Sequence, residues 1–132
     1  MYSKYIGIPY TKAHCWQLVA LIQKEIFCIT VPMFEDINPD NIKAVASVIK
    51  SQQCERSKWQ RLAKPKHGCI VLMHRGGVAT HAGVYIKTDI MAGVIHTSRE
   101  ASSHFTHINQ LCVAWNVTGY YMPIKGAFKN DN

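Results

Sequence analysis

The first part of the chain carries apolar residues at the spacing of an α-helix. Between residues 15 and 27 the apolar positions recur every three or four residues, and the polar residues 23–25 fall on the other side. This pattern predicts an amphipathic helix. A second helix is predicted from residue 42 to about Cys54, because residues 38–41 (Asn-Pro-Asp-Asn) offer an N-cap followed by a proline in the first turn.

After Gly68 the pattern changes to short runs rich in Val, Ile and aromatic residues, separated by Gly or polar residues. These runs predict strands at 69–74, 80–86, 93–97, 111–115 and 119–122. Helices followed by consecutive strands predict an α+β fold in which N-terminal helices pack on an antiparallel β-sheet.

The length and composition indicate one globular domain. A chain of 132 residues buries roughly two thirds of the surface that it exposes when unfolded. The apolar share of 48% against a charged share of 17% is far from a disordered composition. We therefore expect a single domain over residues 1–132, with a short polar tail from about residue 129.

The apolar runs are too short for a membrane span. The longest, residues 18–22 and 69–73, are far below the roughly 18 residues that such a helix needs. The first twenty residues also lack the apolar stretch of a signal peptide. We therefore expect synthesis in the cytoplasm without signal-dependent export.

The net charge of +7 is concentrated in one stretch. Residues 43–66 hold seven Lys or Arg residues against Glu55 alone, which accounts for +6 of the +7. A solvated helix face and loop explains this stretch without any function, and an acidic partner is the functional interpretation. A nucleic-acid binder ranks last, because Trp59 is the single aromatic residue available there for base stacking.

The five cysteines do not form a disulfide framework, since their number is odd and a domain of this size needs no such cross-links. No Cys-x-x-Cys pair occurs, and the His104/His107 pair is too isolated to define a zinc site. We expect reduced thiols, no metal and no cofactor.

Two histidines are expected to meet across a β-hairpin. With a symmetric loop centred on Thr88 and Asp89, residues whose numbers sum to 177 face each other, which pairs His81 with His96. A one-residue asymmetry in the loop would put them on opposite faces of the sheet. Each histidine alone could equally be an ordinary core or surface residue, and it is the pairing that suggests a general base with an orienting partner.

Cys15 is the candidate nucleophile. It stands at the predicted start of the first helix, where the helix dipole stabilises a thiolate. The other cysteines lie at helix ends or within strands, where a small buried side chain is the ordinary role. That ordinary role is also open to Cys15, but a cysteine with histidines far along the chain is typical of cysteine hydrolases.

The residues in this order resemble the NlpC/P60 family of cysteine peptidases. The resemblance spans residues 7 to about 122 and rests on Gly-Ile-Pro-Tyr at 7–10, Cys-Trp-Gln-Leu-Val at 15–19, Gly68 before a strand, His-Ala-Gly-Val-Tyr-Ile at 81–86, and His96 in the next strand. The form Cys-Trp-x-Leu-Val resembles phage and prophage tail-associated members. His14 and the pair Trp16-Gln17 differ from the residues more common around the family's cysteine.

The resemblance implies a papain-like fold and hydrolysis of amide bonds in bacterial peptidoglycan stem peptides, typically between D-glutamate and a diamino acid. By position, Cys15 would be the nucleophile, His81 the base and His96 the orienting residue, with Tyr10 supporting the oxyanion or the substrate. No cofactor is implied. Delivery to the cell wall by a phage tail or a secretion device would fit the missing export signal, and so would a cytoplasmic protein.

Two other functions stay open. The first is a catalytically idle tail or wall-binding module of the same fold, although retention of Cys15, His81 and His96 argues against it. The second is the basic nucleic-acid-binding protein described above, whose binding would depend strongly on salt.

Overall fold

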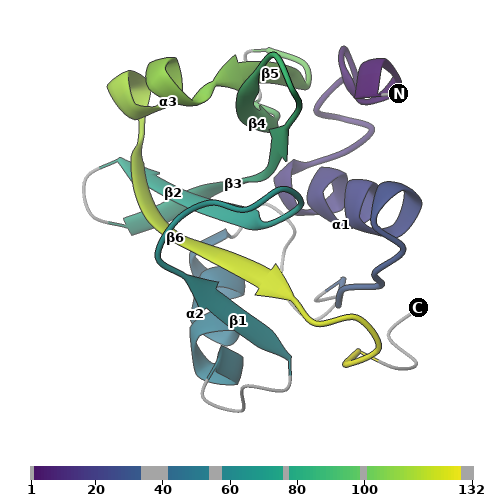
Figure 1. Ribbon diagram of the computed structural model, residues 1–132, viewed down its shortest axis with the longest axis vertical. Coiled ribbons are helices and arrows are strands. Elements are labelled where there is room, and N and C mark those ends of the chain that lie inside the picture. The colour runs from purple at the N-terminus through teal and green to yellow at the C-terminus, as the bar shows by residue number, and fades with distance from the viewer. Residues whose placement is uncertain (1, 34–41, 54–57, 76–77, 99–100, 129–132) are drawn as a thin grey trace.

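The computed structural model describes residues 2–33, 42–53, 58–75, 78–98 and 101–128. Two α-helices precede the strands along these residues, and a third lies between the last two strands (Figure 1). The elements are η1, a 3₁₀-helix (Tyr2–Tyr5), α1 (Cys15–Ile26), α2 (Ile42–Gln53), β1 (Trp59–Leu62), β2 (Ile70–Arg75), β3 (Val78–Lys87), β4 (Ala92–His96), β5 (His104–His107), α3 (Ile108–Ala114) and β6 (Asn116–Pro123).

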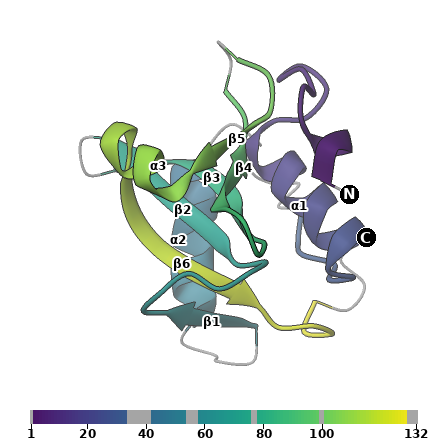
Figure 2. The same ribbon diagram turned by 45° about the horizontal axis from the view of Figure 1, so that its top comes forward.

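The described strands form one antiparallel sheet in the order β1-β6-β2-β3-β4-β5. Helices α1 and α2 pack on one face, and α3 packs on the other face near β4 and β5 (Figure 1 and Figure 2). The larger apolar cluster, which includes Trp16, Ile22 and Trp59, lies on the α1–α2 face, and a smaller one around Leu111 lies beneath α3. The predicted α+β class with an antiparallel sheet is confirmed.

Helix α1 forms as its apolar spacing predicts, with one exception on its polar side. Leu18 and Ile22 are buried in the core, and the charged residues 24 and 25 are exposed. Gln23, which the pattern puts on the polar side, is fully buried. Its Nε2 atom donates a 2.7 Å hydrogen bond to the carbonyl oxygen of Gly68, so this buried amide ties α1 to the loop before β2.

Four of the predicted strands are present as β2, β3, β4 and β6, with ends shifted by one to three residues. The predicted strand at 111–115 is wrong, because these residues lie in and just after helix α3. Ile108, Leu111 and Trp115 recur at helical spacing and pack into the cluster beneath α3, whereas Cys112 and Val113 are exposed. A five-residue apolar run fits the period of a strand or of a helix, and the structure buries it at the helical period.

Strands β1 and β5 are not predicted by the sequence pattern. Each has four residues and mixes apolar with polar side chains, so neither shows a strand signal of its own. They form because β6 and β4 offer them partners. The proposed N-cap of α2 at residues 38–41, the end of that helix at Cys54 and the tail from residue 129 lie outside the described residues.

The β3–β4 hairpin has a different register from the predicted one. The observed partners are Tyr85 with Val94 and Lys87 with Ala92, so facing residues sum to 179 and not to 177. The loop is residues 88–91, within which the N–H of Thr88 donates to the carbonyl oxygen of Met91. Because the shift is two residues, each side chain keeps its predicted face of the sheet.

Candidate active site

Cys15 is the first residue of α1, and polar contacts hold the chain on both sides of it. Gln17 Oε1 accepts hydrogen bonds from the backbone N–H of His14, at 3.0 Å, and from its ring Nδ1, at 2.8 Å. Trp16 is buried, and its Nε1 donates to the carbonyl oxygen of Pro32 over 2.8 Å. His14, Trp16 and Gln17 therefore anchor the start of the helix.

The Cys15 thiol faces His81 of β3. Cys15 Sγ lies 3.3 Å from His81 Nδ1 and 3.5 Å from the carbonyl oxygen of Thr97. Cys15 is 6% exposed and His81 3%, so water competes little for this contact. At this distance a proton can pass from the sulfur to the ring nitrogen, which is the step that turns a thiol into a nucleophile.

His96 of β4 lies on the other side of His81. His81 Nε2 and His96 Nδ1 are 2.6 Å apart, and the rings are steeply inclined at 76°. The predicted proximity of the two histidines is confirmed, but they meet diagonally because of the shifted register. Gly83 leaves room for this diagonal contact, since a Cβ atom there would lie 3.0 Å from His96 Cβ and 2.8 Å from the carbonyl oxygen of Ile95.

The histidines also contact residues that were not predicted to belong to the site. Trp115 stacks on His81 with ring centroids 4.5 Å apart and planes 13° apart. Thr106 Oγ1 lies 2.8 Å from His96 Nε2. Thr106 belongs to a strand with no sequence signal, and Trp115 follows a helix that the pattern reads as a strand, so the local sequence offers no signal for either.

The electrostatic surroundings keep His96 neutral. Burial, together with the nearby rings of His81 and His104, lowers the pKa of His96 to about 3. His104 comes from β5, and its ring centroid is 4.3 Å from that of His96. A neutral imidazole has one acceptor nitrogen, so His96 can accept a hydrogen bond from a protonated His81 without adding a second charge.

A pocket of about 290 Å³ opens beside the two histidines. Side chains of β3, β4, β5 and the end of α3 line it, among them His81, His96, His104 and Trp115. Its volume is at the lower end of the range for sites that take small ligands. A polar group of a substrate could therefore reach the ring of His81 from this side.

Tyr10 lies next to the start of α1. Its half-buried ring meets the ring of His14 edge-on, with centroids 4.8 Å apart. The segment before it is held by Ser103, whose Oγ donates to the carbonyl oxygen of Tyr5 at 2.6 Å and accepts from the N–H of Ile8 at 2.8 Å. Tyr10 is thus near the helix that carries Cys15, and its contribution to substrate or oxyanion binding stays a prediction.

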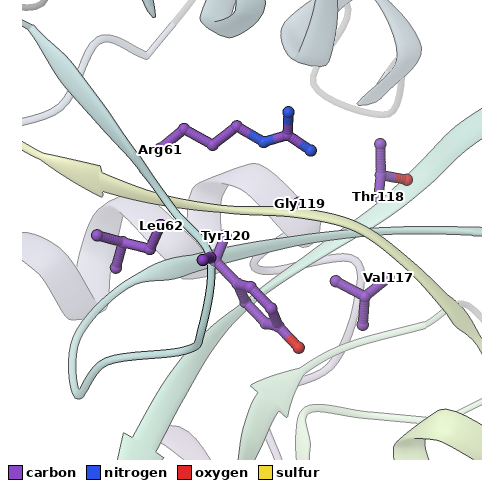
Figure 3. Close-up of a pocket in the computed structure, with 7 residues that line it drawn as sticks. Arg61, Leu62, Val117, Thr118, Gly119 and Tyr120 are labelled. Carbon is purple, nitrogen blue, oxygen red and sulfur yellow. The ribbon is translucent and has the colours of Figure 1, made fainter.

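The basic stretch is only partly described. Arg61, Lys64 and Lys66 are exposed, whereas Arg56 lies outside the described residues. Arg61 lines a second pocket of about 580 Å³ at the β1–β6 edge. Figure 3 shows Arg61 and Thr118 on one side of β6 and Tyr120 on the other. None of Cys15, His81 and His96 lines this pocket, so it is separate from the cysteine site.

In the part of the chain that the structure describes, no three His, Cys, Asp or Glu side chains are grouped to hold a metal ion. The helices of the same residues include none that is long and apolar enough to cross a membrane. Cys15, His81 and His96 are the predicted site residues that the structure brings into one hydrogen-bonded group. Comparison of the chain with protein-family models and with curated proteins finds no match.

Proposed function

We propose that this protein is a cysteine peptidase with a papain-like fold of the NlpC/P60 type, which hydrolyses amide bonds in bacterial peptidoglycan stem peptides. The bond between D-glutamate and a diamino acid is the proposed target. The observation that carries the proposal is a row of contacts that begins at the start of α1. Cys15 Sγ lies 3.3 Å from His81 Nδ1, and His81 Nε2 lies 2.6 Å from His96 Nδ1. The identity of the substrate rests on the resemblance of the motifs to the family.

In the first half of the reaction, His81 Nδ1 takes the proton of the Cys15 thiol, and Sγ attacks the carbonyl carbon of the amide. The negative charge that develops on the carbonyl oxygen is stabilised by the backbone N–H of Cys15 and by the partial positive charge at the start of α1. The carbon–nitrogen bond then breaks as protonated His81 gives its proton to the leaving amine. The acyl group is left as a thioester on Cys15.

In the second half, His81 takes a proton from a water molecule that attacks the thioester carbon. The carbon–sulfur bond breaks, the product leaves as a carboxylic acid, and the sulfur takes back the proton. His96 holds the plane of the His81 ring through both halves, and the stacked Trp115 restrains the same ring from its face. Neither makes a bond to substrate in this mechanism.

The test is mass spectrometry of purified peptidoglycan fragments after incubation with the wild-type protein and with Cys15→Ala. The wild type should convert stem peptides into two products whose summed mass exceeds that of the substrate by one water. Cys15→Ala should leave the fragments intact, and Cys112→Ala, which removes an exposed thiol, should act like the wild type. Intact fragments with the folded wild type would favour the idle wall-binding module instead.

A further inference from the structure

A continuous chain of hydrogen-bonding contacts runs from Cys15 to a residue that the mechanism above does not use. It passes from Cys15 Sγ to His81 Nδ1 over 3.3 Å and from His81 Nε2 to His96 Nδ1 over 2.6 Å. It ends with His96 Nε2, 2.8 Å from Thr106 Oγ1. The last three members come from β3, β4 and β5, which are neighbours in the sheet (Figure 2).

The positions of the protons along this chain determine the role of Thr106, its last member. When His81 holds the proton taken from Cys15, both of its ring nitrogens are donors. His96 Nδ1 must then accept, because two facing N–H groups at 2.6 Å would repel each other. A neutral His96 consequently carries its one proton on Nε2, and that N–H points at Thr106 Oγ1.

Because His96 is buried, its Nε2–H group needs an acceptor within the protein. His96 is 4% exposed, so an Nε2–H group without an acceptor would lose its hydrogen bond to water and gain nothing in return. The titratable side chains around it in the described residues are His81 from β3 and His104 from β5, with Cys15 of α1 reached through His81. The end of α3 contributes Trp115, which does not titrate.

We propose that Thr106 is a positioning residue of the site, whose hydroxyl accepts from His96 Nε2 and thereby keeps His96 in the tautomer that accepts from His81. The effect of Thr106 on catalysis rests on the proposed function. The tautomer of His96 is a property of the resting protein. Thr106 acts through His96 and then His81, two residues away from the thiol.

The direct test is NMR measurement of the ring nitrogen shifts of His96, which distinguish a proton on Nε2 from one on Nδ1. Wild type and Thr106→Ser, which keeps the hydroxyl, should show the Nε2–H tautomer. Thr106→Val has nearly the same shape without the hydroxyl and should shift His96 toward Nδ1–H. If the wild type carries the proton on Nδ1, or if Thr106→Val leaves the tautomer unchanged, the proposal is wrong.

Thr118 provides the matched control. It is another sheet threonine whose Oγ1 lies 2.7 Å from a histidine ring nitrogen, that of His74, and it lies at the second pocket (Figure 3). Thr118→Val removes a similar contact and should leave His96 as in the wild type. If Thr106→Val does not fold, an Nδ1–H tautomer in the wild type or in Thr106→Ser would still overturn the proposal.

A second readout links the tautomer to the thiol. With His96 donating toward His81, a protonated His81 is disfavoured, and less Cys15 is present as thiolate. We expect Thr106→Val to lower the rate of Cys15 alkylation at neutral pH about tenfold and to move its pH profile upward, with Thr106→Ser close to the wild type. An unchanged profile in Thr106→Val contradicts the proposal.

The failure of this inference and the failure of the proposed function look different. If the wild type shows the Nε2–H tautomer and Thr106→Val changes it, while peptidoglycan stays intact, the positioning role holds and the peptidase assignment is wrong. If peptidoglycan is cleaved and His96 keeps its tautomer in Thr106→Val, the peptidase assignment holds and the role of Thr106 is wrong.

Discussion

Cys15 and Cys69 are both buried, yet Cys15 has a base beside it. Burial raises the pKa of the Cys69 thiol to about 11, because its nearby backbone hydrogen bonds compensate only partly for the lost water. Cys15 is 6% exposed, and its sulfur lies 3.3 Å from an imidazole nitrogen that can take the proton. At the scale of single residues, the neighbour rather than the degree of burial distinguishes the two thiols.

The first prediction concerns the order in which the thiols react. Low-dose iodoacetamide near neutral pH should modify Cys15 before Cys28 and Cys112, although both of these are exposed, because the thiolate is the reactive form. Mass spectrometry of the digested protein locates the label. His81→Ala should remove this advantage. Labelling of the two exposed thiols ahead of Cys15 in the wild type would contradict an activated Cys15.

The second prediction separates the base from its orienting partner. His81→Ala should abolish nearly all peptidoglycan hydrolysis, because this ring both takes and gives the proton. His96→Asn and His96→Gln keep an acceptor for His81 Nε2 and should retain more turnover than His96→Ala, which we expect to lose on the order of a hundredfold through misorientation. Turnover is measured on variants whose circular dichroism matches the wild type. Full activity in His96→Ala would refute the orienting role.

At the scale of elements, the β3–β4 hairpin brings the histidines together. In the observed register, Gly83 lies across from His96, and the missing side chain leaves space in which the rings of His81 and His96 can meet. A Cβ at Gly83 would also contact a methyl group of Val94. The glycine therefore serves the packing of the two strands and the geometry of the site at once.

The third prediction follows from this close approach. Gly83→Ala should lower the free energy of unfolding by roughly 1–3 kcal/mol, because the added methyl would lie 2.8 Å from the backbone oxygen of Ile95, which cannot rotate away. Urea unfolding measures this change. Because the strands must separate to relieve the contact, Cys15 alkylation should also slow in Gly83→Ala. A variant with wild-type stability would show that the hairpin accommodates the methyl without strain.

At the scale of the whole molecule, one face of the sheet holds most of the apolar core and the other holds the contacts of the two histidines. Most of the core lies between the sheet and helices α1 and α2 (Figure 1). Helix α3 packs on the opposite face, on which His81 stacks with Trp115 and His96 contacts Thr106 of the edge strand β5. The site is thus built where segments from both ends of the chain meet. The basic surface around Arg61 lies away from it, at the β1–β6 edge.

The fourth prediction concerns the dependence of stability on pH. The unfolded chain protonates His96 below pH 6.5, whereas the folded protein keeps it neutral down to about pH 3. The unfolded state therefore binds more protons in this window, and the free energy of unfolding falls as the pH falls, by at most about 1.4 kcal/mol per pH unit from this group. Urea unfolding across this range should show a smaller slope for His96→Asn. His107→Asn, at an exposed position, is the control and should keep the wild-type slope.

The fifth prediction concerns the basic surface. If it attracts an acidic substrate, charge reversal at the exposed Arg61 and Lys64 should weaken peptidoglycan hydrolysis several-fold at low salt and little at high salt. Turnover at saturating substrate should stay near the wild-type value. Lys24→Glu, which reverses a charge on α1, is the control and should keep the wild-type turnover at both salt concentrations. Loss of turnover at every salt concentration would instead mean that these residues belong to the site or to the fold.

Several features of this protein follow from the sequence alone because they depend on local periodicity. Helical spacing places Cys15 at the start of α1, and the alternation of side chains in strands puts His81 and His96 on one face. The order of helices and strands predicts the α+β class. A pairing shift of two residues leaves these conclusions unchanged, since the period of a strand is two.

Other features were decided only by the tertiary structure. Residues 111–114 are helical because Leu111 can be buried beneath α3 while Val113 stays in water, and an isolated apolar run does not contain that choice. Strand β5 exists because β4 offers it a partner, and it brings Thr106 to His96. These contacts join residues that are distant in sequence or have no local signal, so their formation depends on the free energy of packing the whole sheet and not on the propensity of any one segment.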